Sequence, residues 1–479
     1  QVKVRYTVAI TESDNTRTLV DTEDNFTMKW NEKRIYMMNY ERNANEMFTG
    51  KREAFSGKRI ILGITNDNMV KTVKSPKSRY LAFKTGGDLW CYDQTDNELV
   101  RIFTFDSSKD DGIRSRYDRH DVKILSVQED GTVDFLVYGY MNRGKYEGHM
   151  GVIYYSYDAE KDTVNEKFYL AASESFEKIR EDISTLSYLS QNSMMYLMLE
   201  GSVYGIDLKS NEFLVVAQGL TKGSFAVSGD GSRIAWQDGA SLYESEKVHV
   251  MDFNTAQKQE ITGSEGDYVR VLGFVGNDLI YGFSNSGDKW IVNGRMKGMP
   301  MYAMYIVDNE MQVESEYRKD GIYISDVVAE DGRIHLKRLV RISENQYMYQ
   351  DQDTIVCNQK VDDGELKGIG YFASQDRGRV YYVQTDSDLN GDKVNISAPR
   401  AFSYEFASTL DISFAATAQA DTGMVFHAYG GGHYLGCSRS FGTAVNMAYG
   451  QMGFVTDSNQ HIVWDRINRG PIRNIKSPV

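Results

Sequence analysis

The sequence has few cysteines, few prolines and no long apolar run, and each scarcity excludes a class of protein. Its 479 residues include 3 Cys, 5 Pro and 42 Gly. Cys91, Cys357 and Cys437 lie far apart without a Cys-x-x-Cys pair, so disulfides are not the main source of stability. A collagen-like chain is excluded because Gly and Pro are too sparse. No stretch approaches the roughly 18 consecutive apolar residues of a membrane-spanning helix.

Positive charge is also scarce. Lys and Arg number 54 against 67 Asp and Glu, which leaves a formal net charge of −13. Nucleic acids and anionic membranes attract clustered basic residues, and the sequence has no such block. Both are therefore disfavoured as partners. The chain starts at Gln1, and no signal sequence follows, so we expect a processed piece of a longer protein.

Short β-strand patterns separated by Gly, Asp, Asn and Ser turns are abundant. Strands are predicted at Tyr80–Phe83, Leu89–Tyr92 and Leu99–Phe105, with a turn between each pair. The same succession returns at Met194–Gln218 and at Phe225–Ile261. A repeat of roughly 40 to 50 residues with three or four strands per unit is typical of a β-propeller.

Six such units can be counted, and two further hairpins lie near the ends of the repeat region. The units cover about 68–105, 121–172, 180–218, 222–263, 268–318 and 320–360. Pairing the hairpin Phe26–Tyr40 with Gly370–Phe406 would close the ring without a free sheet edge. The predicted fold is therefore all-β: a seven-bladed propeller over residues 1–412, or eight blades if each hairpin forms its own.

The pattern changes after residue 412. A helix is predicted at Phe441–Gln451, with Ser440 as its N-cap and Gly453 just beyond its end. The predicted strands around it are Met424–Tyr429, Tyr434–Cys437, Gly453–Thr456 and His461–Arg466. We therefore expect a small α+β (ββαββ) module at 422–470 and a tail at 471–479. A weaker helical stretch is predicted at Phe176–Ile183.

Two segments resemble the repeat of TolB-like (WD40-like) propellers. One is Ser75–Phe83 followed by Asp88–Asp93, and the other is Ser228–Trp236 followed by Val248–Phe253. In that repeat a Ser-Pro-Asp-Gly-Lys turn precedes an Ile-Ala-Phe strand, and the next strand carries an aspartate. The chain departs from the pattern at Lys77, where the repeat has Asp, and at Gly229, where it has Pro.

The resemblance implies a scaffold that docks proteins or peptides; in some enzymes such a propeller gates a separate catalytic domain. Phe274–Tyr281 and Gly321–Asp326 also look like segments of uncharacterised surface propellers of Gram-positive anaerobes. That second resemblance implies no activity. It implies an extracytoplasmic protein anchored at the cell surface through a segment that this chain does not contain.

The segment 386–397 is the sharpest local motif. Oxygen-bearing side chains at positions 1, 3 and 5 with Gly at 6 match the opening of an EF-hand calcium loop. The predicted ligands are Asp386, Asp388, Asn390, Asp392 and Asn395. The motif departs from an EF-hand at its twelfth position, where Ser397 replaces the bidentate Glu. Structural calcium is therefore one interpretation, and a polar hairpin turn is the other.

Cys437 is the candidate nucleophile, with His433 and His461 as its candidate partners. A cysteine just before a helix N-terminus can have a stabilised thiolate. The simpler interpretation of Cys437 is a small buried apolar residue in a short strand. Motifs of other hydrolases and of nucleotide-binding sites are absent from the sequence.

These observations favour a non-catalytic recognition or scaffolding protein that binds a protein or peptide through a propeller face. The 32 tyrosines fit both inter-blade packing and an exposed recognition surface. An accessory or gating part of a cell-surface hydrolase or peptidase is the first alternative. A glycan-binding propeller is the second. The ligand, the oligomeric state and a catalytic domain elsewhere in a longer protein are left open.

Overall fold

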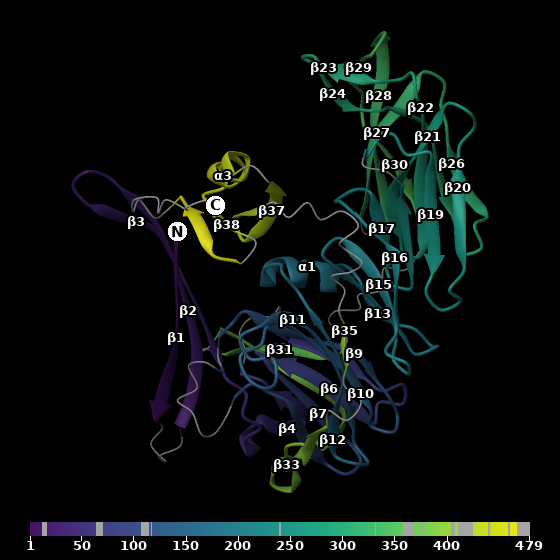
Figure 1. Ribbon diagram of the computed structural model, residues 1–479. Coiled ribbons are helices and arrows are strands. Elements are labelled where there is room, and N and C mark those ends of the chain that lie inside the picture. The colour runs from purple at the N-terminus through teal and green to yellow at the C-terminus, as the bar shows by residue number, and fades with distance from the viewer. Residues whose placement is uncertain are drawn as a thin grey trace, which may run out of the picture. The chain divides into compact units, whose positions relative to one another are not determined.

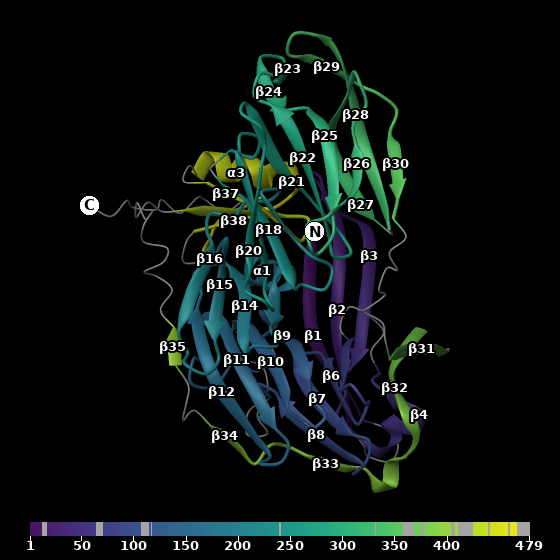
Figure 2. The same cartoon turned by 90° about the vertical axis from the view of Figure 1, so that its right-hand side faces the viewer.

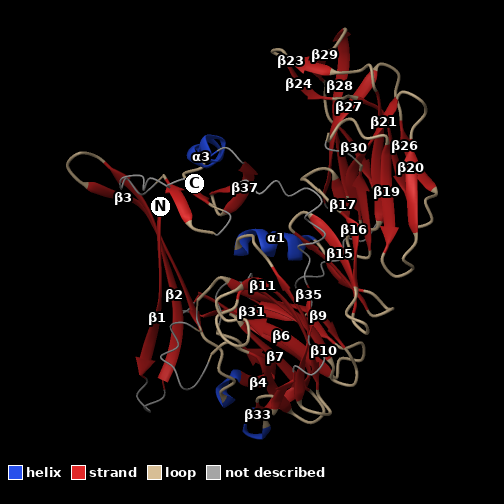
Figure 3. Ribbon diagram, viewed as in Figure 1, coloured by secondary structure: helices blue, strands red, loops and turns tan. Residues whose placement is uncertain are grey.

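Strands dominate the structure because runs of β-branched and aromatic residues alternate with turn residues. The computed structural model describes residues 1–11, 17–63, 70–106, 115, 117–238, 241–330, 332–357, 368–374, 378–403, 408–410, 425–438, 441–457 and 460–466. Figure 3 shows strands throughout these ranges and little helix. Helix α1, Phe176–Thr185, confirms the helical stretch predicted there.

Four groups of consecutive strands form four-stranded antiparallel meanders, in which each strand pairs with the next (Figure 1). The first is β5 Val70–Lys74, β6 Tyr80–Thr85, β7 Asp88–Asp93 and β8 Glu98–Phe103. The second is β9 His120–Val127, β10 Val133–Tyr140, β11 Met150–Asp158 and β12 Thr163–Ala171. The third is β13 Ser187–Leu189, β14 Met194–Leu199, β15 Ser202–Asp207 and β16 Phe213–Ala217. The fourth is β17 Phe225–Val227, β18 Arg233–Gln237, β19 Lys247–Asp252 and β20 Lys258–Thr262.

A fifth and a sixth group share one sheet. The fifth is β21 Asp267–Val275, β22 Asp278–Asn285, β25 Met301–Val307 and β26 Val313–Tyr317, with the hairpin β23 Trp290–Val292 and β24 Arg295–Gly298 inserted. The sixth is β27 Ile322–Glu330, β28 Arg333–Ser343, β29 Gln346–Tyr349 and β30 Asp353–Val356. The two groups meet where Met301 pairs with Ile324.

These six groups fall on the six units counted in the sequence. Four-stranded up-and-down sheets are the blades from which propellers are built, and the first five groups have this order. In the sixth group, β29 and β30 both pair with β28. The all-β fold with propeller-type sheets is confirmed, and the number of blades stays a prediction.

The two segments that resemble the TolB-like repeat have the same hydrogen bonds in the first turn of their meanders. The backbone N–H of Ser75 donates to the carbonyl of Tyr80 over 2.9 Å, and Ser228 repeats this bond with Arg233 over 2.9 Å. The serine hydroxyl in turn accepts the N–H of Tyr80 or Arg233, over 3.1 Å and 3.0 Å. The turn also needs a left-handed residue, which explains Gly231 with its φ of 76°.

The last turn of each of the first five strand groups is held by an aspartate at the end of the third strand or directly after it. Each carboxylate accepts a backbone N–H two or three residues further on, which makes an Asx turn. The five aspartates are Asp93, Asp158, Asp207, Asp252 and Asp308. The aspartate in the repeat pattern therefore has a structural role.

Aromatic rings fill the space between the first two meanders. Phe103 of β8 lies 6.0 Å from Phe135 of β10 and 5.9 Å from Tyr155 of β11, measured between ring centroids. All three rings are buried in one apolar cluster that contains residues of both sheets. Burial of each ring contributes about 1.5–3 kcal/mol, so this cluster holds the two sheets in contact.

The predicted pairing of the terminal hairpins is wrong in its N-terminal partner. The later hairpin, β31 Ile369–Ser374 and β32 Gly378–Asn390, pairs with β4 Phe55–Ile61, in the order β31-β32-β4. Phe26–Tyr40 lies instead in a separate sheet of β1 Val2–Thr11, β2 Arg17–Trp30 and β3 Ile35–Glu46. Figure 1 shows these three strands as a long twisted ribbon. β2 is paired on both sides, and no described strand pairs with the outer edge of β3, so the late hairpin does not join this sheet.

Three short strands after β32 extend the first two meanders. β33 Asn395–Ser397 adds in parallel to β8, whereas β34 Ala401–Ser403 and β35 Ser408–Leu410 add in parallel to β12 (Figure 2). Two 3₁₀ turns, at Arg52–Ala54 and Gly391–Lys393, lie near this part of the chain. The added strands pair with what would otherwise be outer edges of the two sheets.

Near the C-terminus, strands β36 Phe426–Gly430, β37 His433–Ser438, β38 Phe454–Thr456 and β39 Ile462–Asp465 form a sheet in the order β37-β36-β38-β39. Helix α3, Phe441–Gly450, lies between β37 and β38 in the chain and packs with Ala444 and Ala448 against Ala428 and Val455. Residues 411–424 and the N-cap Ser440 lie outside the described residues. The domain boundaries at 412 and 422–470 and the 471–479 tail stay predictions.

The chain divides into two compact units. One consists of Gln1–Arg180 with Asp363–Val479, and the other is Glu181–Asp362. No helix in the described ranges is long and apolar enough to cross a bilayer.

Candidate functional site

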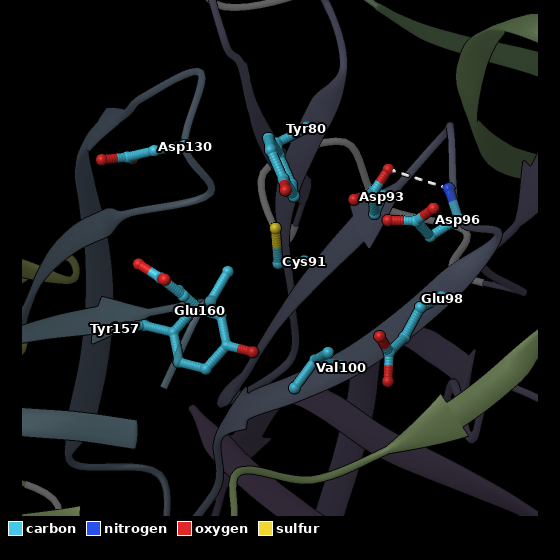
Figure 4. Close-up of a pocket in the computed structure, with 10 residues that line it drawn as sticks. Tyr80, Cys91, Asp93, Asp96, Glu98, Val100, Asp130, Tyr157 and Glu160 are labelled. Carbon is cyan, nitrogen blue, oxygen red and sulfur yellow. Dashed lines mark hydrogen bonds between the residues drawn. The ribbon is translucent and has the colours of Figure 1, made fainter. Parts of the chain in front are cut away.

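A pocket of about 270 Å³ opens between the first two meanders, at the end where the turns β7–β8, β9–β10 and β11–β12 lie. Its lining combines acidic, aromatic and small residues. They are Tyr80, Cys91, Asp93, Asp96, Glu98, Val100, Asp130, Tyr157, Ala159 and Glu160. Figure 4 shows Asp130 and Glu160 on one side, Asp93, Asp96 and Glu98 on the other, and the sulfur of Cys91 between them. We call this site the acidic pocket.

Basic side chains compensate only part of the negative charge. Arg79 donates from Nη2 to Oδ2 of Asp93 over 2.8 Å and to Oδ2 of Asp96 over 2.9 Å. Asp130 accepts the backbone N–H of Thr132 over 2.9 Å. Within the part of the chain that the structure describes, Asp130 and Glu160 form no ion pair. Arg79 therefore pairs with two of the five carboxylates that line the pocket.

The carboxylate of Asp93 is anionic at neutral pH. Burial alone would raise its pKa, but Arg79 and the backbone N–H groups of Asp96 and Thr95 outweigh this effect and hold the pKa below its ordinary value. On the opposite side of the turn, Glu98 accepts the hydroxyl of Ser397 over 3.1 Å, so β33 helps to hold its carboxylate in place.

The phenols and the thiol of the pocket are protonated at neutral pH. Burial, with the nearby Asp93 as a second cause, raises the pKa of Tyr80 to about 12. Burial likewise raises the pKa of Tyr157 well above its ordinary value and that of Cys91 to about 12. A thiol with this pKa is a poor nucleophile. The pocket thus offers carboxylates as acceptors and aromatic rings with polar tips.

This arrangement suits the binding of a positively charged group. Carboxylates attract a cation, and tyrosine rings add cation–π attraction when the cation lies over a ring face. Across the described residues, no three His, Cys, Asp or Glu side chains converge as a metal site would require. An ammonium or guanidinium group can pair with carboxylates that are spread around the pocket, because it has several donors.

Sequence reasoning did not find this pocket, although a signal was present. Asp93, Asp96 and Glu98 crowd one predicted turn, and Asp130 and Glu160 lie in turns of the next unit. In an up-and-down sheet the first and third turns lie at the same end. Acidic residues in those turns of neighbouring blades therefore converge.

The predicted catalytic residues do not come together. Cys437 is exposed, so the interpretation as a buried residue is wrong. It faces His427 across the β36–β37 pairing, on the sheet face opposite Ala428, which packs against α3. His427 Nδ1 lies 3.2 Å from the hydroxyl of Tyr434. No contact joins Cys437 to His433 or His461 among the described residues.

His433 and His461 lie at exposed positions. His433 begins β37 at the hairpin turn, and His461 lies between β38 and β39 with Nδ1 3.4 Å from Oδ2 of Asp457. A catalytic role for either residue stays an untested hypothesis.

The predicted calcium ligands lie in an irregular part of β32 and in the turn after it. Between Gln384 and Leu389 the register with β4 shifts, so Asp386 and Asp388 lie in a bulge. Asp386 pairs with Lys74 over 2.9 Å, and Asp392 pairs with Arg52 over 3.4 Å. The calcium site stays a prediction.

The two remaining predicted ligands lie on either side of Asp392 in the sequence. Asn390 ends β32, and Asn395 begins β33 with its side-chain amide 3.4 Å from Oε1 of Glu98. The five residues are thus spread from the bulge through the 3₁₀ turn to β33.

Comparisons with known proteins find solved propellers with low sequence identity and low structural similarity to this chain. It matches no protein-family model, and no curated protein matches it. Among solved structures, the WD40 domain of SCAP from fission yeast is 12% identical, covering 77% of this chain and 93% of that one, with a TM-score of 0.30. The β-propeller domain of the Trilobed protease from Pyrococcus furiosus is 14% identical, covering 75% and 95%, with a TM-score of 0.25.

A putative conserved lipoprotein from Clostridium novyi NT is 14% identical, covering 28% of this chain and 86% of that one, with a TM-score of 0.23. TM-scores this low carry no argument about function. The assignment of the fold therefore depends on the sheet topology described above.

Proposed function

We propose that this chain is a non-catalytic recognition or scaffolding protein that binds a basic segment of a protein or peptide partner in the acidic pocket. The observation that carries the proposal is the convergence of five carboxylates around one pocket in which the thiol is held protonated. Electrostatic complementarity of this kind selects a cationic partner and accelerates its association.

The size of the pocket supports a side chain as the bound group. About 270 Å³ lies just below the roughly 300–1,000 Å³ of sites for drug-sized molecules. A Lys or Arg side chain from an extended segment would place its charge between Asp130 or Glu160 and Asp93. Its aliphatic stem would lie along the rings of Tyr80 and Tyr157.

The wider assignment is part of the same proposal. The turn of Ser75–Phe83 and that of Ser228–Trp236 share their hydrogen bonds, which supports the resemblance to TolB-like propellers. From the second resemblance, that of Phe274–Tyr281 and Gly321–Asp326 to surface propellers of Gram-positive anaerobes, we infer an extracytoplasmic protein, anchored at the bacterial surface through another part of a longer protein.

The test is a binding titration with fluorescein-labelled penta-lysine, with penta-glutamate as the opposite-charge probe. Replacing Asp130→Asn and Glu160→Gln together should weaken penta-lysine binding by about tenfold, because each lost charge contact contributes about 0.7 kcal/mol. Rising salt should weaken it further.

The matched control is the double variant Glu32→Gln and Glu53→Gln, which removes the same charge at exposed positions outside the pocket. It should bind penta-lysine like the unaltered protein. Equal loss in both double variants would mean that net charge alone attracts the peptide, and the proposal would be wrong.

A further inference from the structure

Strand β1 has an outer edge that no other described strand covers. Its ten residues pair continuously with β2, from Val2 opposite Phe26 to Thr11 opposite Arg17. On its other side β1 pairs with nothing in the described ranges. A free edge presents a row of unpaired N–H and C=O groups that can receive another strand.

The usual protections of an edge strand are missing from β1. It contains no proline, and its register with β2 has no bulge. Its two charges are compensated by nearby carboxylates: Lys3 pairs with Glu23 of β2 over 3.0 Å, and Arg5 pairs with Asp21 of β2 and, over 2.7 Å, with Asp118, which precedes β9. The charges therefore repel an incoming strand less than free charges would.

The apolar side chains of β1 lie on one face and are exposed. Val2, Val4, Tyr6, Val8 and Ile10 alternate along the strand, and each leaves between 36% and 44% of its surface exposed. Such a continuous exposed apolar row on a free edge is unusual for a strand without a partner.

The sequence of β1 is complementary to itself about Tyr6. In an antiparallel pair of two β1 strands centred there, Val4 faces Val8 of the second copy and Val2 faces its Ile10. On the other face, Lys3 is opposite Ala9 and Arg5 is opposite Thr7, so no like charges stand directly opposite each other. A shift of two residues in either direction leaves one apolar residue without an apolar neighbour.

We propose that two copies of this chain associate edge to edge through β1, in an antiparallel register centred on Tyr6, to form one continuous six-stranded sheet. The contact is isologous, as a two-fold dimer requires. This surface lies apart from the acidic pocket, and the proposal does not depend on the function assigned to that pocket.

The first test uses sedimentation velocity on the full chain over a range of concentrations. The unaltered protein should form dimers. The double variant Val4→Lys with Val8→Lys places like charges opposite each other and should weaken the dimer by roughly tenfold or more. Val4→Lys with Val8→Glu carries the same number of polar replacements but places opposite charges together, so it should remain a dimer.

A second test locates the two-fold axis. At Tyr6 the two backbones would be about 4.5–5.5 Å apart, within the range of a disulfide, so Tyr6→Cys should form a cross-linked dimer on oxidation. Val8→Cys is the matched control, because its two copies would be roughly 14 Å apart along the strands. Both variants carry Cys437→Ser, since Cys437 is exposed.

Circular dichroism of each variant shows whether it is folded. A monomeric unaltered protein, equal behaviour of the two charge variants, or equal cross-linking at positions 6 and 8 would overturn the proposal. If this edge instead binds a strand of a different protein, the chain alone would sediment as a monomer, and the charge variants would sediment like the unaltered protein. That result would overturn the proposal as well.

Discussion

At the scale of single residues, the same side chain serves opposite purposes according to what lies around it. Asp93 and Asp278 are both buried aspartates. Asp93 has Arg79 and two backbone N–H groups as donors, which hold its pKa below the ordinary value. Asp278, the first residue of β22, lies beside the carboxylate of Glu314, and burial followed by this like charge raises its pKa to about 6. Asp93 stabilises its turn as an anion, whereas burial and Glu314 disfavour the anionic form of Asp278 relative to an exposed aspartate.

The raised pKa of Asp278 predicts how stability depends on pH. The unfolded pKa is about 3.9, so between pH 4 and 6 the native state binds more protons than the unfolded state. The contribution of Asp278 is therefore fully present below pH 4 and is lost as pH rises through about 6. Asp278→Asn should raise the free energy of unfolding at pH 7.5 by about 1–3 kcal/mol and have little effect at pH 4.

Urea denaturation at the two pH values measures this difference. Glu310→Gln, an exposed turn residue of the same unit, is the control and should change stability little at either pH. A variant of Asp278 that is less stable at pH 7.5 would contradict the assignment.

At the scale of elements, the bulge in β32, like most of the turns, is held by a polar side chain. Thr385 is buried and donates its hydroxyl to the carbonyl of Ser387 over 2.9 Å, which turns Asp386 and Asp388 outward. Lys74 then pairs with Asp386 and is the main cause of the lowered pKa of that carboxyl. A bound cation would have to replace this ammonium group.

The calcium hypothesis predicts a thermal shift. After chelation, adding calcium at about a hundred times its dissociation constant should stabilise the fold by about 2.7 kcal/mol, a rise of several degrees in Tm. Asp386→Asn with Asp388→Asn should abolish the rise, and Lys74→Ala should lower the calcium concentration needed.

Magnesium at the same concentration is the control, because it prefers a tighter octahedral shell. An unchanged Tm after calcium addition, measured by differential scanning fluorimetry, would show that the 386–395 segment is a polar structural bulge.

At the scale of the whole molecule, the chain divides into two compact units, each with buried clusters of its own. Units with separate cores unfold independently unless their contact is large. Leu81 of β6 and Leu197 of β14 are both fully buried, one in each unit.

We therefore predict two transitions in differential scanning calorimetry. Leu81→Ala and Leu197→Ala should each destabilise its own unit by about 2–5 kcal/mol and lower the Tm of one transition by several degrees. Each variant serves as the control of the other. A single transition lowered by both variants would mean that the units unfold as one.

The strand groups and their turns could be predicted because their causes are local. Ser75 and Asp93 determine turns through bonds to residues at most five positions away, and the alternation in Tyr80–Phe83 is visible in any short window. The helix at Phe441–Gly450 was predicted in the same local way, from a candidate N-cap and from Gly453 just beyond its end.

The failures of prediction concern partners that are distant in sequence. The partner of the late hairpin is β4, more than 300 residues away, and β4 carries no pattern that distinguishes it from β2 or β3. Cys437 alternates within an apolar strand, but the helix covers only the other face of that sheet. Pairing and burial of this kind depend on non-local packing.

The sequence by itself determined that this chain is an all-β protein of repeated four-stranded units with Asx-held turns, because backbone preferences and side-chain bonds within a few residues decide such features. Only the tertiary structure decided which strand closes the late hairpin, that no described strand covers the outer edge of β1, and that five acidic residues from separate turns converge on one pocket. Those features exist only when distant segments lie side by side, and the free energy that brings them together comes from buried surface that no local pattern specifies.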